Sequence, residues 1–227
     1  MNRIALARTT LLALTTSLAF AHAAYGAESA SDPTKFVPAP APAGSYTEDK
    51  AHSSLVLRVN HLGFSHFTAR FARFDIQLQL DPAHLSAAHL TARIDPNSLV
   101  SDNAPSGFLE MLRGPQWLDT AQFPELSYRS TQVEVTGPNA LRIRGELTLH
   151  GVTRPVVLNA TFNGGYAGHP MDPHARVGFS AHGSFKRSDF GLSFGVPPPG
   201  TQFGVGDEID VTIETELSGP AYHGAAS

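Results

Sequence analysis

The chain has 227 residues, of which 41% are hydrophobic and 16% are charged, and its formal net charge is −4. This length allows one barrel domain or two small domains, with enough apolar residues for a core. The slightly negative charge and the lack of a basic patch argue against a nucleic-acid partner. Cysteine is absent, which excludes disulfides and a lipid anchor on cysteine.

The N-terminal residues have the pattern of a secretory signal peptide. Arg3 and Arg8 form a basic region, an apolar stretch covers 11–24, and Ala21-His22-Ala23 fits a small-x-small cleavage site. The apolar stretch is too short for a membrane span. We therefore predict a signal peptide over residues 1–23, with cleavage as late as residue 27, and a periplasmic location for the mature protein.

Two segments lack the apolar pattern of folded structure. Residues 28–44 hold four prolines among alanine and serine, which predicts an extended linker. Residues 219–227 follow the last apolar alternation and predict a disordered tail. The folded domain is therefore expected over residues 45–218.

The first half of this domain shows three stretches with the period-two alternation of half-buried strands. They cover residues 55–59, 67–80 and 90–94. In the second stretch the apolar face changes parity near residues 72–73. A one-residue slip within a long strand predicts a β-bulge that bends it.

A short helix is predicted near residues 106–118, where the alternation stops. Leu112 and Trp117 belong to an apolar set with roughly helical spacing. Ser106 is placed to cap this helix and Gly114 to end it.

The second half of the domain contains five further alternating stretches and a tight turn. Gly151 at the second place of the His150-Gly151 turn suits a conformation with positive φ. Pro155 has no N–H for a central ladder, so we expect it at a strand start or on a bulge. A second change of phase precedes Val133. The stretches cover 126–135, 141–149, 156–162, 177–185 and 209–217, and residues 190–206 form a long rim loop rich in glycine and proline.

Eight expected strands without a βαβ alternation indicate an all-β barrel or sandwich. Eight strands enclose either a packed interior or one small ligand, and the pattern alone leaves both alternatives open.

The segment Gly145-Glu-Leu-Thr-Leu-His-Gly-Val-Thr-Arg-Pro-Val resembles the signature hairpin of the YceI-like family of lipid-binding periplasmic proteins. The resemblance implies an extended eight-stranded antiparallel barrel of lipocalin type that holds a long apolar polyisoprenoid. Further matches follow the family's order over residues 45–218: His52-Ser53, His61-Leu62-Gly63-Phe64-Ser65, Phe123-Pro124-Glu125-Leu126 with Ser130-Thr131, Arg187-Ser188-Asp189-Phe190-Gly191 and Gly206-Asp207-Glu208-Ile209.

Apolar residues on single strand faces are the candidates for a ligand-binding interior. A packed core is the alternative, but the core of a barrel is also the wall of its cavity. Leu112 and Trp117 of the helical segment are placed to close one end. The expected interior residues on the strands are Leu55, Leu57, Phe67, Phe71, Phe162, Phe179, Ala181 and Phe185.

No pattern of residues indicates catalysis. The histidines lack the spacing of metal ligands, so we expect no metal. No Gly-x-Ser-x-Gly elbow is present, and we expect neither a cofactor nor a reaction. His52 with Ser53 is expected to have a structural role at a strand start.

These observations lead to one main hypothesis. The protein binds an isoprenoid-type lipid, a polyisoprenoid or an isoprenoid quinone, inside the barrel and acts as a periplasmic carrier or reservoir. One alternative is a redox or enzymatic accessory that uses a bound quinone-like head group, and another is a filled barrel that serves as an interaction module. The hypothesis allows transient membrane contact and a homodimer, and it excludes nucleic acid.

Overall fold

The computed structural model describes residues 40–223. The predicted signal peptide, all but the end of the predicted linker, and residues 224–227 of the predicted tail lie outside the described residues. Within them no helix has the length and apolarity that crossing a bilayer requires.

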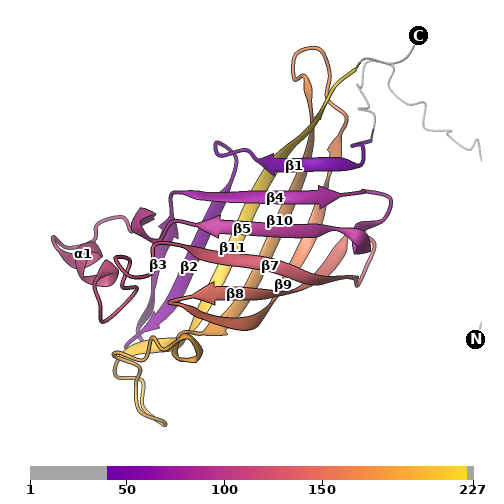
Figure 1. The fold of residues 1–227 in the computed structure, drawn as a ribbon. Helices are drawn as coiled ribbons and strands as arrows, with labels where there is room; N and C mark the ends of the chain where they lie inside the picture. The colour runs from indigo at the N-terminus through magenta and orange to yellow at the C-terminus, as the bar shows by residue number, and fades with distance from the viewer. Residues whose placement is uncertain (1–39, 224–227) are drawn as a thin grey trace, which may run out of the picture. The chain divides into compact units, whose positions relative to one another are not determined.

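Antiparallel strands account for most of the described chain (Figure 1). The first strands are β1 (Gly44–Glu48), β2 (Ser54–His61), β3 (Ser65–Phe71), β4 (Phe74–Leu80), β5 (His89–Ile94) and β6 (Leu99–Val100). The later strands are β7 (Leu126–Val135), β8 (Ala140–Leu149), β9 (Val152–Tyr166), β10 (His174–Lys186) and β11 (Val205–Ala221). The described helices are α1 (Phe108–Arg113) and the 3-10 turns η1 (Leu85–Ala87), η2 (Pro96–Ser98) and η3 (Arg187–Phe190).

Eight of the described strands close a barrel, which confirms the predicted fold. Neighbours pair in the order β1, β4, β5, β7, β8, β9, β10 and β11, and β11 returns to β1 through the pair Glu48↔Leu217. The N-terminal part of β11 pairs instead with β2; β2 pairs in turn with β3, and β3 with β6. In Figure 1 strands β1, β4, β5, β7 and β8 cross in front of the long strands β10 and β11.

Two details of the first half differ from the sequence prediction. Residues Gly44–Glu48 form strand β1, which the sequence did not predict. The predicted bulge near 72–73 is wrong, because β3 and β4 are separate strands with different partners. The chain turns a corner between them, held by Ser98, whose carbonyl accepts from Ala72 N at 3.0 Å and whose Oγ accepts from Arg73 N at 2.9 Å.

Helix α1 is shorter than predicted and begins differently. Gly107, with φ +80°, is its N-cap, so the proposed cap by Ser106 is wrong. Gly114 does end the helix. Figure 1 shows α1 on the outer side of the barrel, beyond β3.

The hairpin of β8 and β9 follows the prediction closely. His150 and Gly151 have φ values of +52° and +73°, which is typical of a two-residue turn in which both residues are left-handed. Pro155 lies near the start of β9 and pairs with Glu146, before the ladder to β10 begins at Leu158. Its missing N–H therefore removes no bond to β10.

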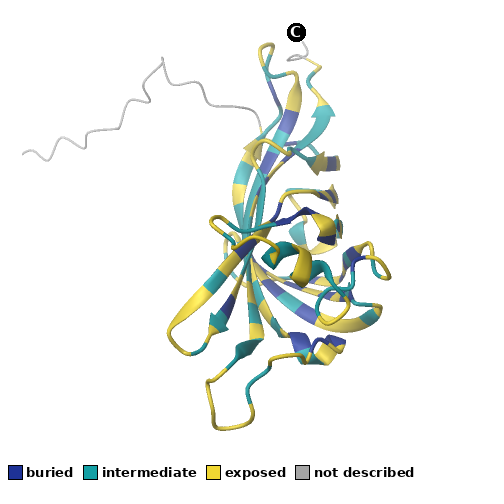
Figure 2. Ribbon diagram, turned by 90° about the vertical axis from the view of Figure 1, so that its left-hand side faces the viewer, coloured by how far each residue is buried: buried dark blue, intermediate teal, exposed yellow. Residues whose placement is uncertain are grey.

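Alternation along the strands separates the inside of the barrel from the outside (Figure 2). Strand β4 is strict, because its even-numbered residues from Phe74 to Leu80 are buried and those between them are exposed. The second predicted change of phase coincides with a register shift between Ser130 and Gln132 in the ladder of β7 and β8. The buried residues of the eight strands that close the barrel belong to one continuous core.

Candidate functional site

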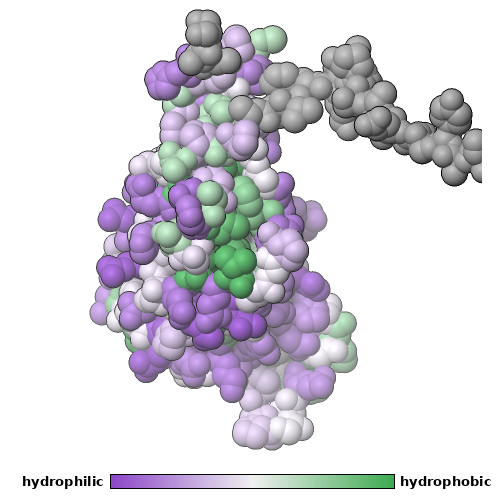
Figure 3. Space-filling view, turned by 90° about the vertical axis from the view of Figure 1, so that its right-hand side faces the viewer, coloured by the Kyte–Doolittle hydropathy of each residue, from purple (hydrophilic) through white to green (hydrophobic). Residues whose placement is uncertain are grey.

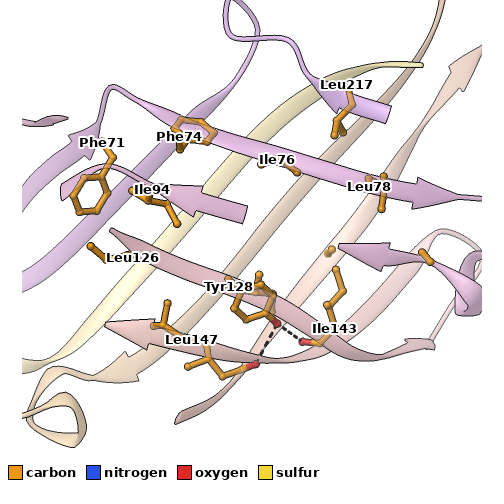
Figure 4. Close-up of a cluster of buried hydrophobic side chains, with 14 of the residues drawn as sticks. Phe71, Phe74, Ile76, Leu78, Ile94, Leu126, Tyr128, Ile143, Leu147 and Leu217 are labelled. Carbon is orange, nitrogen blue, oxygen red and sulfur yellow. Dashed lines mark hydrogen bonds between the residues drawn. The ribbon is translucent and has the colours of Figure 1, made fainter. Parts of the chain in front are cut away.

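An inner cavity of about 180 Å³ lies within the barrel. The inward side chains of β4, β5, β7, β8, β9, β10, β11 and β2 form its wall, and of the described residues that line it none is charged. Its polar side chains are those of Tyr128 and Thr215. Figure 4 shows side chains from β4 and β7 that point into this interior.

The polar side chains of the inner wall have partners in the protein. Tyr128 Oη donates to the carbonyls of Ile143 and Val156 at 3.2 Å each, and burial raises the pKa of this phenol to about 12. Thr215 Oγ1 is hydrogen-bonded to Ser53 Oγ at 2.8 Å. Because these groups are satisfied, the inner cavity offers an apolar surface.

The two sides of the inner cavity differ in burial. Its residues on β4, such as Ile76 and Leu78, are buried, whereas Leu55 on β2, Phe179 on β10 and Ile213 on β11 are only half-buried. A side chain inside a barrel remains half-buried when the space in front of it is not filled. The strands β2, β10 and β11 therefore face the hollow part of the barrel. Figure 3 shows apolar side chains that reach the surface on the face away from α1, surrounded by hydrophilic ones.

An outer cavity of about 730 Å³ adjoins α1. Both cavities are bordered by the same five residues, so they are neighbours. The outer cavity alone has the size of a ligand pocket, roughly 300–1,000 Å³. The shared residues are Leu57, Phe71, Leu126, Phe185 and Ile209.

The outer cavity combines apolar and polar groups. Phe67 of β3 packs edge-on against Phe108 of α1, with 5.4 Å between the ring centroids. His61, His66 and Asp102 also line this cavity and are exposed, so it borders solvent. The site thus has an apolar inner part and a polar mouth.

Nine of the ten predicted interior residues border one or both cavities. Phe162 borders neither, and its ring packs against Phe179 with a centroid distance of 5.1 Å. Contact of these residues with a ligand stays a prediction. Leu55, Leu57, Phe71, Phe179, Ala181 and Phe185 line the inner cavity, and Leu57, Phe67, Phe71, Leu112, Trp117 and Phe185 line the outer one.

Sequence reasoning missed the opposite wall. Ile76 and Leu78 of β4, and Ile143 and Leu147 of β8, line the inner cavity. Their alternation was visible in the sequence, and it would have placed them on the same inner face.

Arg187 attaches the loop after η3 to the mouth. The residue is 4% exposed, and its guanidinium donates to the carbonyls of Gly206, Leu192, Phe194 and Val205 at 2.6–2.9 Å. Burial lowers the pKa of Arg187. Its Cζ also lies 5.4 Å from the centroid of the nearby indole ring, that of Trp117, which is a cation–π arrangement.

Two of the short motifs meet beside this arginine. Asp207 accepts from Ser188 N at 2.9 Å and from Ser188 Oγ at 2.8 Å. The motifs around Arg187 and Asp207 therefore fix the geometry of the mouth.

Trp117 has an unused hydrogen-bond donor. Its Nε1 is buried and finds no acceptor among the described residues. Since Trp117 borders the outer cavity, this N–H could donate to an oxygen of a bound ligand.

The β9–β10 hairpin end of the barrel carries a network of charges. Arg176 forms ion pairs with Asp49 and, at 2.7 Å, with Asp172. Asp49 also accepts from His52 Nδ1 at 3.1 Å, and hydrogen bonds from His52 and Arg176 lower the pKa of Asp49 to about 2. The ligand atoms of Asp49, His52 and Glu216 lie within 4.8 Å of one another, but Asp49 is already ion-paired with Arg176. This arrangement fits a structural role for His52 before β2.

Known proteins resemble the chain in sequence and in fold. The model of the family described as the YceI-like domain matches residues 46–217. A UPF0312 protein of Vibrio cholerae is 35% identical over 158 residues, covering 69% of this chain and 82% of the relative. The crystal structure of BcnA from Burkholderia cenocepacia has a TM-score of 0.63 at 21% identity, covering 74% of this chain and 98% of that one.

A further solved structure shares the fold at lower identity. It is described as a polyisoprenoid binding domain from Saccharophagus degradans implicated in plant cell wall breakdown, and it has a TM-score of 0.53 at 15% identity over 78% of this chain and 99% of that one. The barrel, its apolar interior and the match over residues 46–217 agree, and the chain belongs to the YceI-like family.

Proposed function

We propose that the protein binds an isoprenoid-type lipid, a polyisoprenoid or an isoprenoid quinone, in its barrel and acts as a periplasmic carrier or reservoir. The observation that carries this proposal is the inner cavity, whose described lining residues include no charge. Long apolar chains are the ligands that such a wall favours, because burial of apolar surface drives binding. The likeness to a polyisoprenoid binding domain supports the same ligand class.

Binding without a reaction is part of the proposal. The histidines of the mouth, His61 and His66, lie in exposed positions, and the hydrogen bonds of Tyr128 are used within the barrel. A nucleophile oriented by a neighbouring base is the arrangement that covalent catalysis requires. Among the described residues that line the two cavities, no hydroxyl is hydrogen-bonded to a histidine.

A quinone-like head group is the second candidate, with a redox or enzymatic accessory role. One observation favours it, the buried Nε1 of Trp117 beside the outer cavity. A quinone carbonyl could accept from this donor while the isoprenoid chain occupies the inner cavity. The mass and redox titration of the extracted lipid separate this candidate from a plain polyisoprenoid.

Blocking the inner cavity tests the proposal. Ala181 lies on the inner face of β10 and borders the cavity, whereas His182 on the same strand points outward and is exposed. We expect Ala181→Trp to fold and to lose most of its lipid, because the indole occupies the space of the ligand. His182→Trp is the matched control and should keep its lipid.

The measurement is lipid per protein in an organic extract, with circular dichroism as the folding check. A folded Ala181→Trp protein that carries as much lipid as the wild type would place the ligand elsewhere. Wild-type protein without any lipid would favour the filled barrel.

The periplasmic part of the proposal has its own test. The signal-peptide pattern predicts that the exported protein begins between residues 24 and 28. N-terminal sequencing that returns Met1 would remove this location and leave the binding proposal standing.

A further inference from the structure

Two loops lie side by side at the mouth of the outer cavity. One is the turn between β2 and β3 together with the first residue of β3, residues 62–65, and the other is the long loop of residues 191–204. Leu62 N donates to Gly204 O at 2.9 Å, and β2 pairs with β11 at His61↔Val205 directly beside this bond. Ser65, Leu192 and Val205 border the outer cavity. We call these two loops the rim.

The rim exposes phenylalanine side chains to solvent. Phe64 is 82% exposed, Phe203 is 80% exposed and Phe194 is 51% exposed. Met111 of α1, which also borders the outer cavity, is half exposed. The rim loops form the lower end of the molecule in Figure 1, below β11. Three of the six large hydrophobic residues that the described chain exposes thus lie in the rim.

The rim carries no charge. Neither residues 62–65 nor residues 191–204 include Asp, Glu, Lys, Arg or His. The protein has 36 Lys, Arg, Asp and Glu residues in total. Two exposed loops of this length without any of them are unusual for a surface that only contacts water.

The rim is also held in place. Arg187 binds the carbonyls of Leu192 and Phe194, and Val205 N donates to Gly195 O at 2.9 Å. Phe194 packs edge-on against Trp117 with a centroid distance of 5.4 Å. The exposed phenylalanines are therefore presented by an ordered support.

We infer that the rim docks on a lipid bilayer and places Phe64 and Phe203 in its interfacial layer. Aromatic side chains at loop tips suit this layer, where amphipathic and apolar groups meet the head groups. The rim offers protruding uncharged tips next to a cavity with an apolar interior, an arrangement that suits the apolar interior of a bilayer.

The absence of charge predicts how docking depends on lipid and salt. A surface that binds through Lys or Arg prefers anionic lipids and releases at high salt. The rim has no such residues and the chain has a net charge of −4. We expect binding to zwitterionic phosphatidylcholine vesicles, little change at high salt and no gain from anionic lipid.

The test compares two variants of the full protein in vesicle flotation. Phe64→Ser with Phe203→Ser removes both tips, and Met171→Ser removes a side chain that is 91% exposed in the hairpin at the other end of β10. Because binding scales with the apolar area inserted, the double variant should partition at least about tenfold more weakly than the wild type. Met171→Ser should bind as the wild type does, and unchanged unfolding midpoints establish that both variants fold.

Fluorescence gives a second measurement that locates the contact. Trp117 is the single tryptophan of the sequence and touches the rim through Phe194. Phosphatidylcholine brominated on its acyl chains should quench Trp117 in the wild type and much less in the double variant. Wild-type protein that does not float, a double variant that floats equally, or binding abolished by high salt would overturn the inference.

This inference goes beyond lipid binding in the barrel, and the two can fail separately. Protein that carries extractable lipid but does not bind vesicles would remove membrane docking alone. Protein that binds vesicles through Phe64 and Phe203 but never carries lipid would remove the carrier proposal alone.

Discussion

Two phenylalanines at different distances from the hollow part of the barrel should respond differently to truncation. Phe190 of η3 is 1% exposed, borders neither cavity and packs edge-on against Phe185 with a centroid distance of 5.3 Å. Phe179 of β10 is half-buried and borders the inner cavity. The pair therefore compares a filled site with a site beside existing empty space.

The expected losses follow from the atoms removed and the void left behind. Phe190→Ala opens a new cavity in a packed region, which costs about 3–5 kcal/mol. Phe179→Ala forfeits only part of the transfer free energy of its ring, about 1–2 kcal/mol, because the ring was never fully buried. Its void merges with the cavity that is already there, so the additional cavity cost is small.

Urea unfolding of lipid-free protein, followed by circular dichroism, measures both losses. Repeating it on protein loaded with lipid should enlarge the loss for Phe179→Ala. A ligand that binds the folded state adds stability that grows with the logarithm of its affinity, and the variant should bind lipid more weakly. Equal losses for the two variants without lipid would mean that Phe179 faces a packed interior, and the description of a hollow wall on β10 would be refuted.

Two further predictions concern a turn and a carboxyl group. Gly151→Val should destabilise the protein by more than about 1 kcal/mol. The reason is that φ is +73° and a Cβ at this position would lie 2.7 Å from Phe123 Cε1. An unchanged midpoint of urea unfolding would contradict this. Burial raises the pKa of Glu48, at the end of β1, from 4.5 to about 7, so the folded state keeps a proton that the unfolded chain has lost. The free energy of unfolding should therefore fall by at most about 3 kcal/mol as the pH rises from 4.5 to about 7. Glu48→Gln should flatten this slope, and an equally steep slope in the variant would assign it to another group.

Periodicity predicted the faces of the strands well, but apart from the hairpin at His150-Gly151 it gave no information on which strands pair. Tyr46 is the single buried residue of β1, with polar Ser45 and Thr47 beside it, so this strand gives no alternation to detect. A change of phase near 72–73 can mean a bulge or a corner. The contact that decides is with Ser98, which lies 25 residues further along the chain. Long-range pairing of this kind is absent from a local pattern.

The candidate site shows the same limit. Leu55 and Leu78 both lie on the apolar face of their strands. Leu78 is buried, however, whereas Leu55 is half-buried beside the hollow part of the barrel. Which side of a barrel is empty depends on how the sheets close, and the alternation is identical on both sides. Sequence patterns could therefore identify residues that face the interior, but they could not show that those on β2 and β10 lie on the hollow side.

The energetics of a long isoprenoid connect the cavity with the rim. One isoprene unit has five carbons, so its burial from water is worth roughly 4 kcal/mol at ~0.8 per carbon. Eight units would give about 32 kcal/mol, beyond the ceiling of roughly 18–21 kcal/mol for non-covalent binding, so release into water is not a workable route. Transfer to a bilayer avoids this cost, because the lipid leaves one apolar environment for another.

Such a transfer requires the mouth of the barrel to meet the bilayer. At the hairpin end, contact with a membrane would strip water from the ion pairs of Arg176 with Asp49 and Asp172, and that desolvation is expensive. At the rim, the uncharged loops with Phe64 and Phe203 gain by leaving water. The two ends of one barrel thus differ in the sign of the free energy of membrane contact, and the end that favours contact is the one where the outer cavity opens to solvent.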